Sequence, residues 1–162
     1  SLPEPALPGL ERTFNIILTG VGGPGVVTIG AILGMAAHLE GKGIVTQDAA
    51  GLAQKGGATW SHVQIADSAD AIHSTKVGTA EADLVIGCDA IVTAKAETLA
   101  TVRPGRTYVA MNTHATPTAA FVANPDWQFP AAACETAVLA ATGPESVGRL
   151  DADHLVKDTP TT

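Results

Sequence analysis

The chain of 162 residues is 46% hydrophobic and 15% charged, which is typical of one domain with a buried core and excludes a disordered protein. Its net charge of −7 and its nine scattered basic residues argue against a nucleic-acid partner, which would require clustered Lys and Arg. No apolar stretch is long enough to span a bilayer, no signal peptide opens the chain, and its two cysteines form no CxxC pair. We therefore expect a reduced, cytoplasmic protein without a membrane segment or a metal site.

The N-terminal half begins with a proline-rich segment, so we predict a linker over residues 1–12 and one domain over residues 13–162. The largely apolar run Phe14–Thr19 predicts a strand that is buried on both faces. Helical spacing over Val26–Leu39 predicts a helix, and Ile44–Asp48 predicts a second strand. These three elements form a β-α-β unit, which is nearly always right-handed with parallel strands.

The remaining chain alternates between strands and helices. Thr59–Ala66 and Ala71–Val77 predict two extended segments with no helix between them, so we expect a mixed sheet. Leu84–Cys88 predicts a buried strand, and Ala90–Leu99 predicts a helix after it. The last expected elements are a strand at Tyr108–Met111, a helix at Pro130–Ala141 and an edge strand at Gly148–Asp151. This pattern indicates an α/β fold, a three-layer α/β/α Rossmann-like domain.

The first candidate site is the segment Gly20-Val-Gly-Gly-Pro-Gly25, which fits G-x-G-x-x-G between a strand and a helix. Glycines let the backbone approach a ligand, and the helix dipole favours an anion. Asp48 ends the second strand, where a dinucleotide-binding fold keeps its ribose-binding acid, although the spacing is longer than usual. The motif predicts a phosphate-bearing ligand such as NAD or FAD. A tight turn that binds nothing remains an alternative.

The second candidate site is the loop Gly51–Ala58, in which Lys55 precedes a glycine pair. A flexible backbone beside a cation can hold a phosphate or dock a partner, whereas most such loops are surface connections. For His62 and the turn Asn112-Thr113-His114 we favour structural roles, and the sequence indicates no catalytic residue. The candidate binding residues are Gly20, Gly22, Gly23, Gly25, Lys55, Gly56 and Gly57.

Two segments, GVGGPGVVTIGA over residues 20–31 and GLAQKGGA over residues 51–58, resemble the gamma domain of 2-oxoacid:ferredoxin oxidoreductases. The similarity is greatest to indolepyruvate ferredoxin oxidoreductase and covers roughly Thr13–Ala141. Pro24 departs from it, because the family usually has Gln there, and proline removes one backbone donor. The family also continues beyond the last residues of this sequence, so the resemblance implies that the domain 13–162 is incomplete at its C-terminal end.

The resemblance implies an accessory domain of an enzyme that oxidatively decarboxylates an arylpyruvate to its acyl-CoA and reduces ferredoxin. Such an enzyme uses thiamine diphosphate, Mg²⁺ and [4Fe-4S] clusters, which lie in other domains, and coenzyme A as a co-substrate. The resemblance further implies that this domain docks on the thiamine-binding and iron–sulfur domains, helps to hold coenzyme A, and is inactive alone. The alternatives are a free-standing NAD-binding Rossmann domain of a dehydrogenase and a purely structural module.

Overall fold

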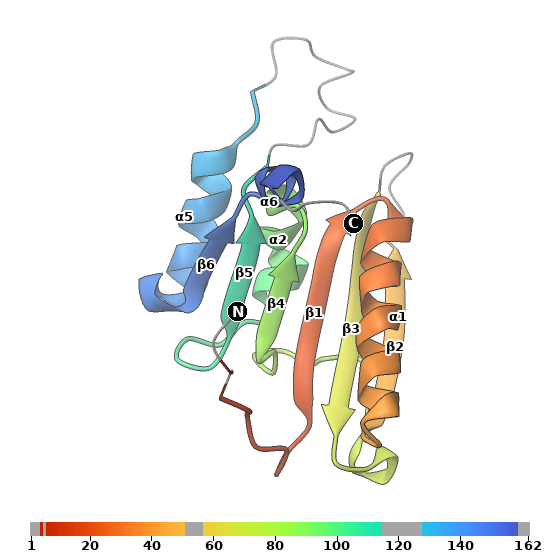
Figure 1. Ribbon diagram of the computed structural model, residues 1–162. Coiled ribbons are helices and arrows are strands. Elements are labelled where there is room, and N and C mark those ends of the chain that lie inside the picture. The colour runs from red at the N-terminus through yellow and green to blue at the C-terminus, as the bar shows by residue number, and fades with distance from the viewer. Residues whose placement is uncertain (1–3, 5, 51–56, 115–127, 159–162) are drawn as a thin grey trace.

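The structure, a computed structural model, describes residues 4, 6–50, 57–114 and 128–158. One six-stranded sheet runs through the molecule, with helices on both of its faces (Figure 1). The strands are β1 (Phe14–Val21), β2 (Gly43–Ala50), β3 (Ala58–Ala66), β4 (Leu84–Gly87), β5 (Tyr108–Asn112) and β6 (Val147–Leu150). The helices are α1 (Gly23–Leu39), α2 (Ala90–Thr93), α3 (Ala96–Leu99), α5 (Ala131–Thr142) and α6 (Ala152–Asp158), with 3₁₀ turns η1 (Ala69–Ala71) and η2 (Pro144–Ser146).

The sheet is mixed, as predicted, with the order β2-β3-β1-β4-β5-β6. Strands β1, β4, β5 and β6 are mutually parallel, while β3 runs antiparallel to both β1 and β2. The predicted reason was wrong, because Ala71–Val77 adds no strand and the direction changes at β3. The connection between β2 and β3 is shorter than the roughly one dozen residues that parallel neighbours need, so these strands pair antiparallel.

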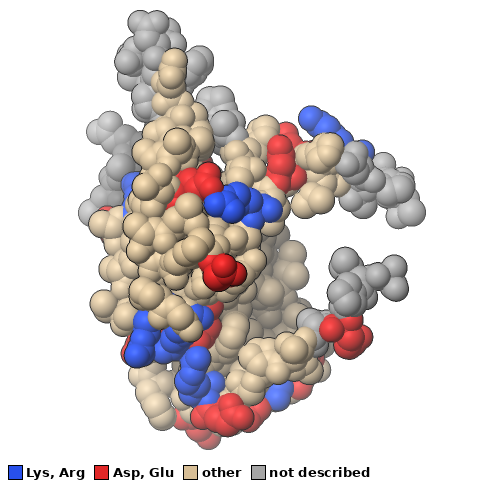
Figure 2. Space-filling model, turned by 90° about the vertical axis from the view of Figure 1, so that its left-hand side faces the viewer, with Lys and Arg blue, Asp and Glu red and all other residues tan. Residues whose placement is uncertain are grey.

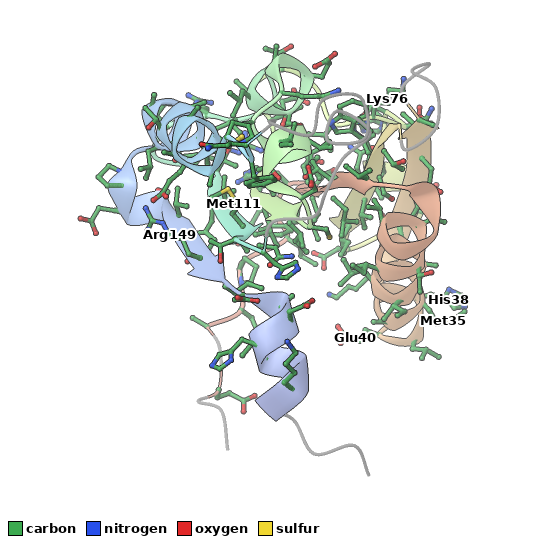
Figure 3. All side chains as sticks on the ribbon, turned by 90° about the horizontal axis from the view of Figure 1, so that it is seen from above. Met35, His38, Glu40, Lys76, Met111 and Arg149 are labelled. Carbon is green, nitrogen blue, oxygen red and sulfur yellow. The ribbon has the colours of Figure 1, made fainter. Side chains whose placement is uncertain are left out.

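Helices cover the sheet on two sides and create two apolar cores. Ile17 and Leu18 are consecutive in β1 and fully buried, and they point into opposite cores. Leu18 packs with Val26 of α1, whereas Ile17 packs in the core that contains Val138 of α5. Viewed from above, α1 and α6 lie on one side of the sheet and α5 lies on the other (Figure 3). The predicted three-layer α/β/α architecture is therefore confirmed.

The helix predicted over Ala90–Leu99 is instead two single turns, α2 and α3. The break falls at Lys95, whose backbone is extended with φ −68° and ψ 150°. The Thr93 hydroxyl donates to the Asp89 carbonyl at 2.6 Å, and the Thr98 hydroxyl donates to the Val92 carbonyl at 2.8 Å. These hydroxyls compete for the backbone carbonyls that a continuous helix would use in its own hydrogen bonds. The β-branched residues of α2 also lower its helix propensity.

The outer face of α1 is apolar. Ile32, Met35 and Leu39 are exposed, and Figure 3 shows Met35 and His38 projecting away from the sheet. Within the part of the chain that the structure describes, no helix has the length and apolar character needed to cross a membrane.

Charged side chains of both signs lie close together on the face that Figure 2 shows. The described ion pairs follow the same pattern: Arg149 pairs with Glu135, and Arg12 and Arg106 both pair with Asp83. Opposite charges are therefore paired locally on this acidic protein.

Candidate ligand-binding site

The glycine loop forms one wall of a pocket of about 190 Å³ at the carboxyl ends of β1 and β4. Open α/β sheets place ligands at this edge of the parallel strands. The helix α1 begins inside the loop, at Gly23, so its N-terminal end faces the same region. The pocket is lined by Gly20, Val21, Gly22, Gly25, Val26, Ile29, Cys88 and Asp89.

The structure explains glycine at two positions of the loop, for different reasons, and leaves a third unexplained. A Cβ on Gly20 would lie 2.5 Å from the Val26 side chain, so close packing requires glycine there. Gly22 has φ +79°, which favours glycine. Gly25 lies in the first turn of α1, and a Cβ there would meet no heavy atom within 4 Å. Glycine inside a helix costs about 1 kcal/mol relative to alanine. The described packing therefore does not explain why position 25 is glycine rather than alanine.

The described end of the second candidate loop, Gly57 and Ala58, lies beside the glycine loop. The antiparallel pairing of β1 with β3 places Val21 opposite Ala58, and the Gly22 amide donates to the Gly57 carbonyl at 3.3 Å. The structure thus brings Gly57 to the glycine loop, whereas Lys55 and Gly56 lie outside the described residues.

The loop is a poor phosphate cradle. The Gly22 amide is already bonded to Gly57, and Pro24 has no N–H to offer. A phosphate at a helix N-terminus needs several free backbone donors. The loop therefore offers a phosphate fewer backbone donors than a G-x-G-x-x-G loop without proline.

Asp89, which is not among the candidate residues predicted from the sequence, contributes a buried carboxylate to the pocket. The residue is 3% exposed, and its Oδ1 caps α2 by accepting the Val92 amide at 2.8 Å. Its Oδ2 is buried and has no hydrogen-bond partner among the described residues. Burial, reinforced by the charge of Asp89, raises the pKa of the neighbouring Cys88 thiol. Cys88 is therefore a neutral thiol rather than an activated nucleophile.

The turn after β5 has a structural role. The Asn112 amide donates to the Cys88 carbonyl at 3.2 Å, and its oxygen accepts the amides of His114 and Ala152, each at 3.1 Å. Asn112 thereby links the ends of β4 and β5 to the start of α6. The structural role favoured for this turn from the sequence agrees with these bonds.

Asp48 does not lie where a dinucleotide-binding fold would need it. It is exposed on the edge strand β2 and pairs with Ser61 of β3. Because β3 lies between β2 and β1, and strands are about 4.8 Å apart, Asp48 is roughly 10 Å from β1. The arrangement of glycine loop and ribose-binding acid that motivated the NAD hypothesis is absent from the described sheet.

His62 is a structural residue. Its Nδ1 accepts the Val77 amide at 3.2 Å. Burial lowers the pKa of His62, and the charge of Lys76 lowers it further, against a smaller opposing effect of Asp48. A neutral imidazole that is bonded to the backbone fits the role favoured from the sequence.

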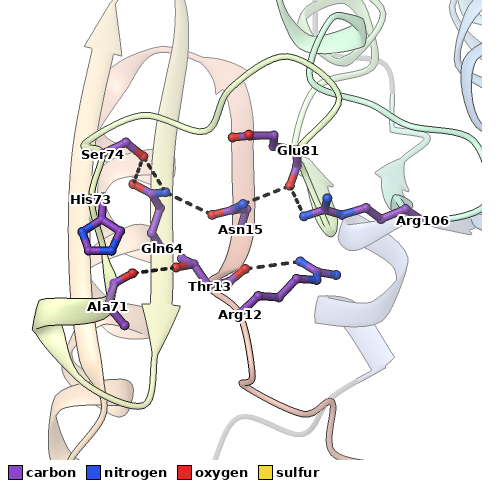
Figure 4. A pocket seen from close by; sticks show the side chains of 9 residues that line it. All are labelled: Arg12, Thr13, Asn15, Gln64, Ala71, His73, Ser74, Glu81 and Arg106. Carbon is purple, nitrogen blue, oxygen red and sulfur yellow. Dashed lines mark hydrogen bonds between the residues drawn. The ribbon is translucent and has the colours of Figure 1, made fainter.

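A second cavity of about 310 Å³ lies at the opposite end of the sheet (Figure 4). Its two arginines, Arg12 and Arg106, are both bonded to Asp83. Gln64 donates to Asn15 and Ser74, each at 3.1 Å. The arginines and amides of this cavity are thus bonded to other groups of the protein, so it is a weaker candidate for ligand binding than the glycine-loop pocket.

The fold and the pocket together define a three-layer α/β domain with a mixed sheet and a glycine loop at the carboxyl edge of its central strands. Residues 15–157 match the family described as "Pyruvate ferredoxin/flavodoxin oxidoreductase", and the chain belongs to this family. The resemblance inferred from the glycine loops is therefore confirmed.

The most informative relatives are components of 2-oxoacid oxidoreductases. A stretch of 54 residues is 43% identical to "Indolepyruvate oxidoreductase subunit IorB" of Archaeoglobus fulgidus and covers 33% of this chain and 27% of that protein. Pyruvate oxidoreductase subunit PORC of Thermotoga maritima superposes with a TM-score of 0.58 at 18% identity, over 90% of this chain and 66% of that one.

A 2-oxoglutarate:ferredoxin oxidoreductase of Magnetococcus marinus, solved with 2-oxoglutarate, coenzyme A and succinyl-CoA bound, superposes with a TM-score of 0.55. It is 13% identical, and the match covers 87% of this chain and 20% of that one. At such identities both solved structures support the fold alone.

The residues of this chain do not fit an iron–sulfur cluster. A [4Fe-4S] cluster is held by four cysteine thiolates, and the sequence has two cysteines. Within the described ranges, no group of three His, Cys, Asp or Glu side chains could hold a metal ion. This chain therefore cannot supply a cluster site by itself.

Proposed function

We propose that this chain is the accessory, gamma-type part of a 2-oxoacid:ferredoxin oxidoreductase of the indolepyruvate type. The observation that carries the proposal is the family match over residues 15–157, together with the 43% identity to an indolepyruvate oxidoreductase subunit. In this proposal, thiamine diphosphate, Mg²⁺ and the [4Fe-4S] clusters belong to other domains, on which this chain docks. Those domains decarboxylate the arylpyruvate, form the acyl-CoA and reduce ferredoxin.

We further propose that the glycine-loop pocket contributes to the binding of coenzyme A. Three observations support this role: the pocket lies at the ligand-binding edge of the sheet, Gly57 is bonded to the loop there, and a structure with this fold was solved with coenzyme A bound. Lys55 is two residues from Gly57 in the sequence. In this proposal, its ammonium group contacts the phosphates of coenzyme A.

The proposal predicts that coenzyme A binds to the purified chain with saturation, while NADH does not. Isothermal titration with each ligand measures this directly. The chain should also co-purify with the thiamine-binding and iron–sulfur subunits of the same organism when the proteins are expressed together. Saturable binding of NADH, or failure to associate with those subunits, would contradict the proposed function.

A pair of lysine variants tests the charge assigned to Lys55. We expect Lys55→Ala to weaken coenzyme A binding about three- to tenfold, because a charge-assisted contact to a phosphate is lost. Lys42→Ala is the matched control, since Lys42 pairs with Asp67 and lies at the far end of α1 from the glycine loop. Equal affinities of the two variants would remove Lys55 from the site.

A further inference from the structure

We propose that Asp89 is a ligand-binding residue and that its pocket accepts an uncharged group that donates a hydrogen bond, either a hydroxyl or an amide. The inference rests on the proposed function, in which the ligand is coenzyme A. It assigns to this pocket a part of the ligand that carries hydroxyls or amides, and it places the phosphates outside.

The first observation is the free oxygen of Asp89. Asp89 lines the pocket, and only its Oδ1 is needed to cap α2, through the Val92 amide. Its Oδ2 is buried and has no hydrogen-bond partner in the described chain. A carboxylate oxygen that is buried without a hydrogen bond is costly, and native proteins rarely keep one without a reason. A ligand N–H or O–H would satisfy it.

The second observation is independent and concerns Gly25. A Cβ at this position would enter open space, and Gly25 lines the same pocket. Glycine in the first turn of α1 is therefore not explained by packing or by backbone conformation within the described residues. A ligand that approaches the backbone closely at this point explains it, because a methyl group would occupy the ligand's place.

The third observation decides which chemical group enters. The negative charge of Asp89 repels a phosphate, and the loop has lost donors at Gly22 and Pro24. The other walls include the apolar side chains of Val21, Val26 and Ile29. A pocket of about 190 Å³ with this lining suits a small, neutral and partly apolar group. Within coenzyme A, both the pantetheine arm and the ribose hydroxyl have this chemistry.

The test is the substitution Asp89→Asn, followed by isothermal titration of coenzyme A into the full chain. Asparagine retains the oxygen that caps α2 and replaces the free oxygen with an NH₂ group, which is itself a donor. We expect the dissociation constant to rise roughly ten- to a hundredfold, as for loss of a hydrogen bond to a charged group. An Asp89→Asn chain that binds coenzyme A as tightly as the wild type, or more tightly, would overturn the inference.

Two further variants keep the result interpretable. Asp67→Asn makes the same change of charge at an exposed residue beyond the opposite edge of the sheet, and we expect unchanged binding. Gly25→Ala should weaken binding by a similar factor while its melting temperature stays equal to that of the wild type or rises. Normal coenzyme A affinity in Gly25→Ala would also count against the site.

Competition with two fragments distinguishes the sources of the donor. Displacement of coenzyme A by pantetheine alone assigns the pocket to the pantetheine arm, and displacement by adenosine 3′,5′-bisphosphate alone assigns it to the ribose hydroxyl. In either case, the displacing fragment must lose affinity for the Asp89→Asn chain. A fragment that retains its affinity for this variant, or failure of both fragments to compete, refutes the inference.

Failure of this inference is distinguishable from failure of the proposed function. A wild-type chain that shows no saturable coenzyme A binding overturns the inference, yet it leaves the docking role intact if the chain still co-purifies with the catalytic subunits. A chain that binds coenzyme A through Asp89 but does not associate with those subunits supports the inference and contradicts the docking role.

Discussion

Replacement of Asp83 by Ala is expected to lower the free energy of unfolding by about 3 kcal/mol at neutral pH, because it breaks a buried ionic network. The Asp83 side chain is 4% exposed. It accepts hydrogen bonds from Arg12 at 2.6 and 2.9 Å, from Arg106 at 2.9 Å and from the Asn15 amide at 2.8 Å. Its removal takes the shared carboxylate acceptor from both guanidinium groups and from the Asn15 amide. Urea unfolding followed by circular dichroism measures the loss.

The effect should depend on pH. Burial alone would raise the pKa of Asp83, but the hydrogen bonds from Arg12, Arg106 and Asn15 outweigh it and lower the pKa. A carboxyl whose pKa is lowered in the folded state stabilises the protein above the pKa of the unfolded chain, which is about 4. This contribution is lost as the pH falls through the lower, folded pKa. We therefore expect the difference between wild type and Asp83→Ala to shrink below about pH 4.

The matched control is Asp67→Ala. Asp67 pairs with Lys42 at 2.9 Å, but its side chain is 69% exposed, and exposed pairs contribute roughly 0–1 kcal/mol. We expect this variant to unfold within about 0.5 kcal/mol of the wild type. Equal losses in the two variants would show that the Asp83 network adds no more than an exposed ion pair.

The same network gives Arg12 a long-range contact. Residue 12 is the last one in the predicted proline-rich linker, and Arg12 lines the cavity in Figure 4 and is bonded to Asp83. Linker composition describes neighbours along the chain, whereas Asp83 is 71 positions away in the sequence. A single sequence does not reveal such a contact.

The strands were largely predictable from the sequence because burial leaves a local pattern. Phe14–Thr19 and Leu84–Cys88 are mainly apolar runs, and both belong to strands with neighbours on either side. The order of the strands was not predictable in the same way. Alternation in Thr59–Ala66 indicates a strand, but it does not indicate that this strand inserts between β1 and β2.

The candidate site was only partly predictable. The glycine loop could be found because its motif is contiguous and lies between a strand and a helix. Asp89 was missed, although an acidic residue directly after a buried strand at the carboxyl edge was the available signal. Such a residue is indistinguishable from an ordinary helix cap in the sequence, and the second oxygen of Asp89 is seen to be free only in three dimensions.

Replacement of Gly43 by Ala is expected to destabilise the fold by about 3 kcal/mol, through overpacking against the main chain. Gly43 opens β2 and is buried, and its backbone φ is not positive, so conformational freedom is not the reason for glycine. A Cβ there would lie closer than 3.0 Å to the backbone of Ser68 and Ala69. Main-chain atoms cannot rotate away as the end of a side chain can, so β2 or the turn before η1 must move.

Gly34→Ala separates this effect from the general consequence of adding a methyl group. Gly34 lies within α1, where a Cβ would make ordinary contacts of 3.4 Å to Thr46 and 3.8 Å to Ile44. Alanine favours the helix there by about 1 kcal/mol, so this variant should unfold later than the wild type. Both substitutions restrict the unfolded chain similarly, so their difference of about 4 kcal/mol reports native packing. Thermal and urea unfolding measure both variants, and a stable Gly43→Ala protein would mean that the segment around Ser68 does not pack on β2 as the structure shows.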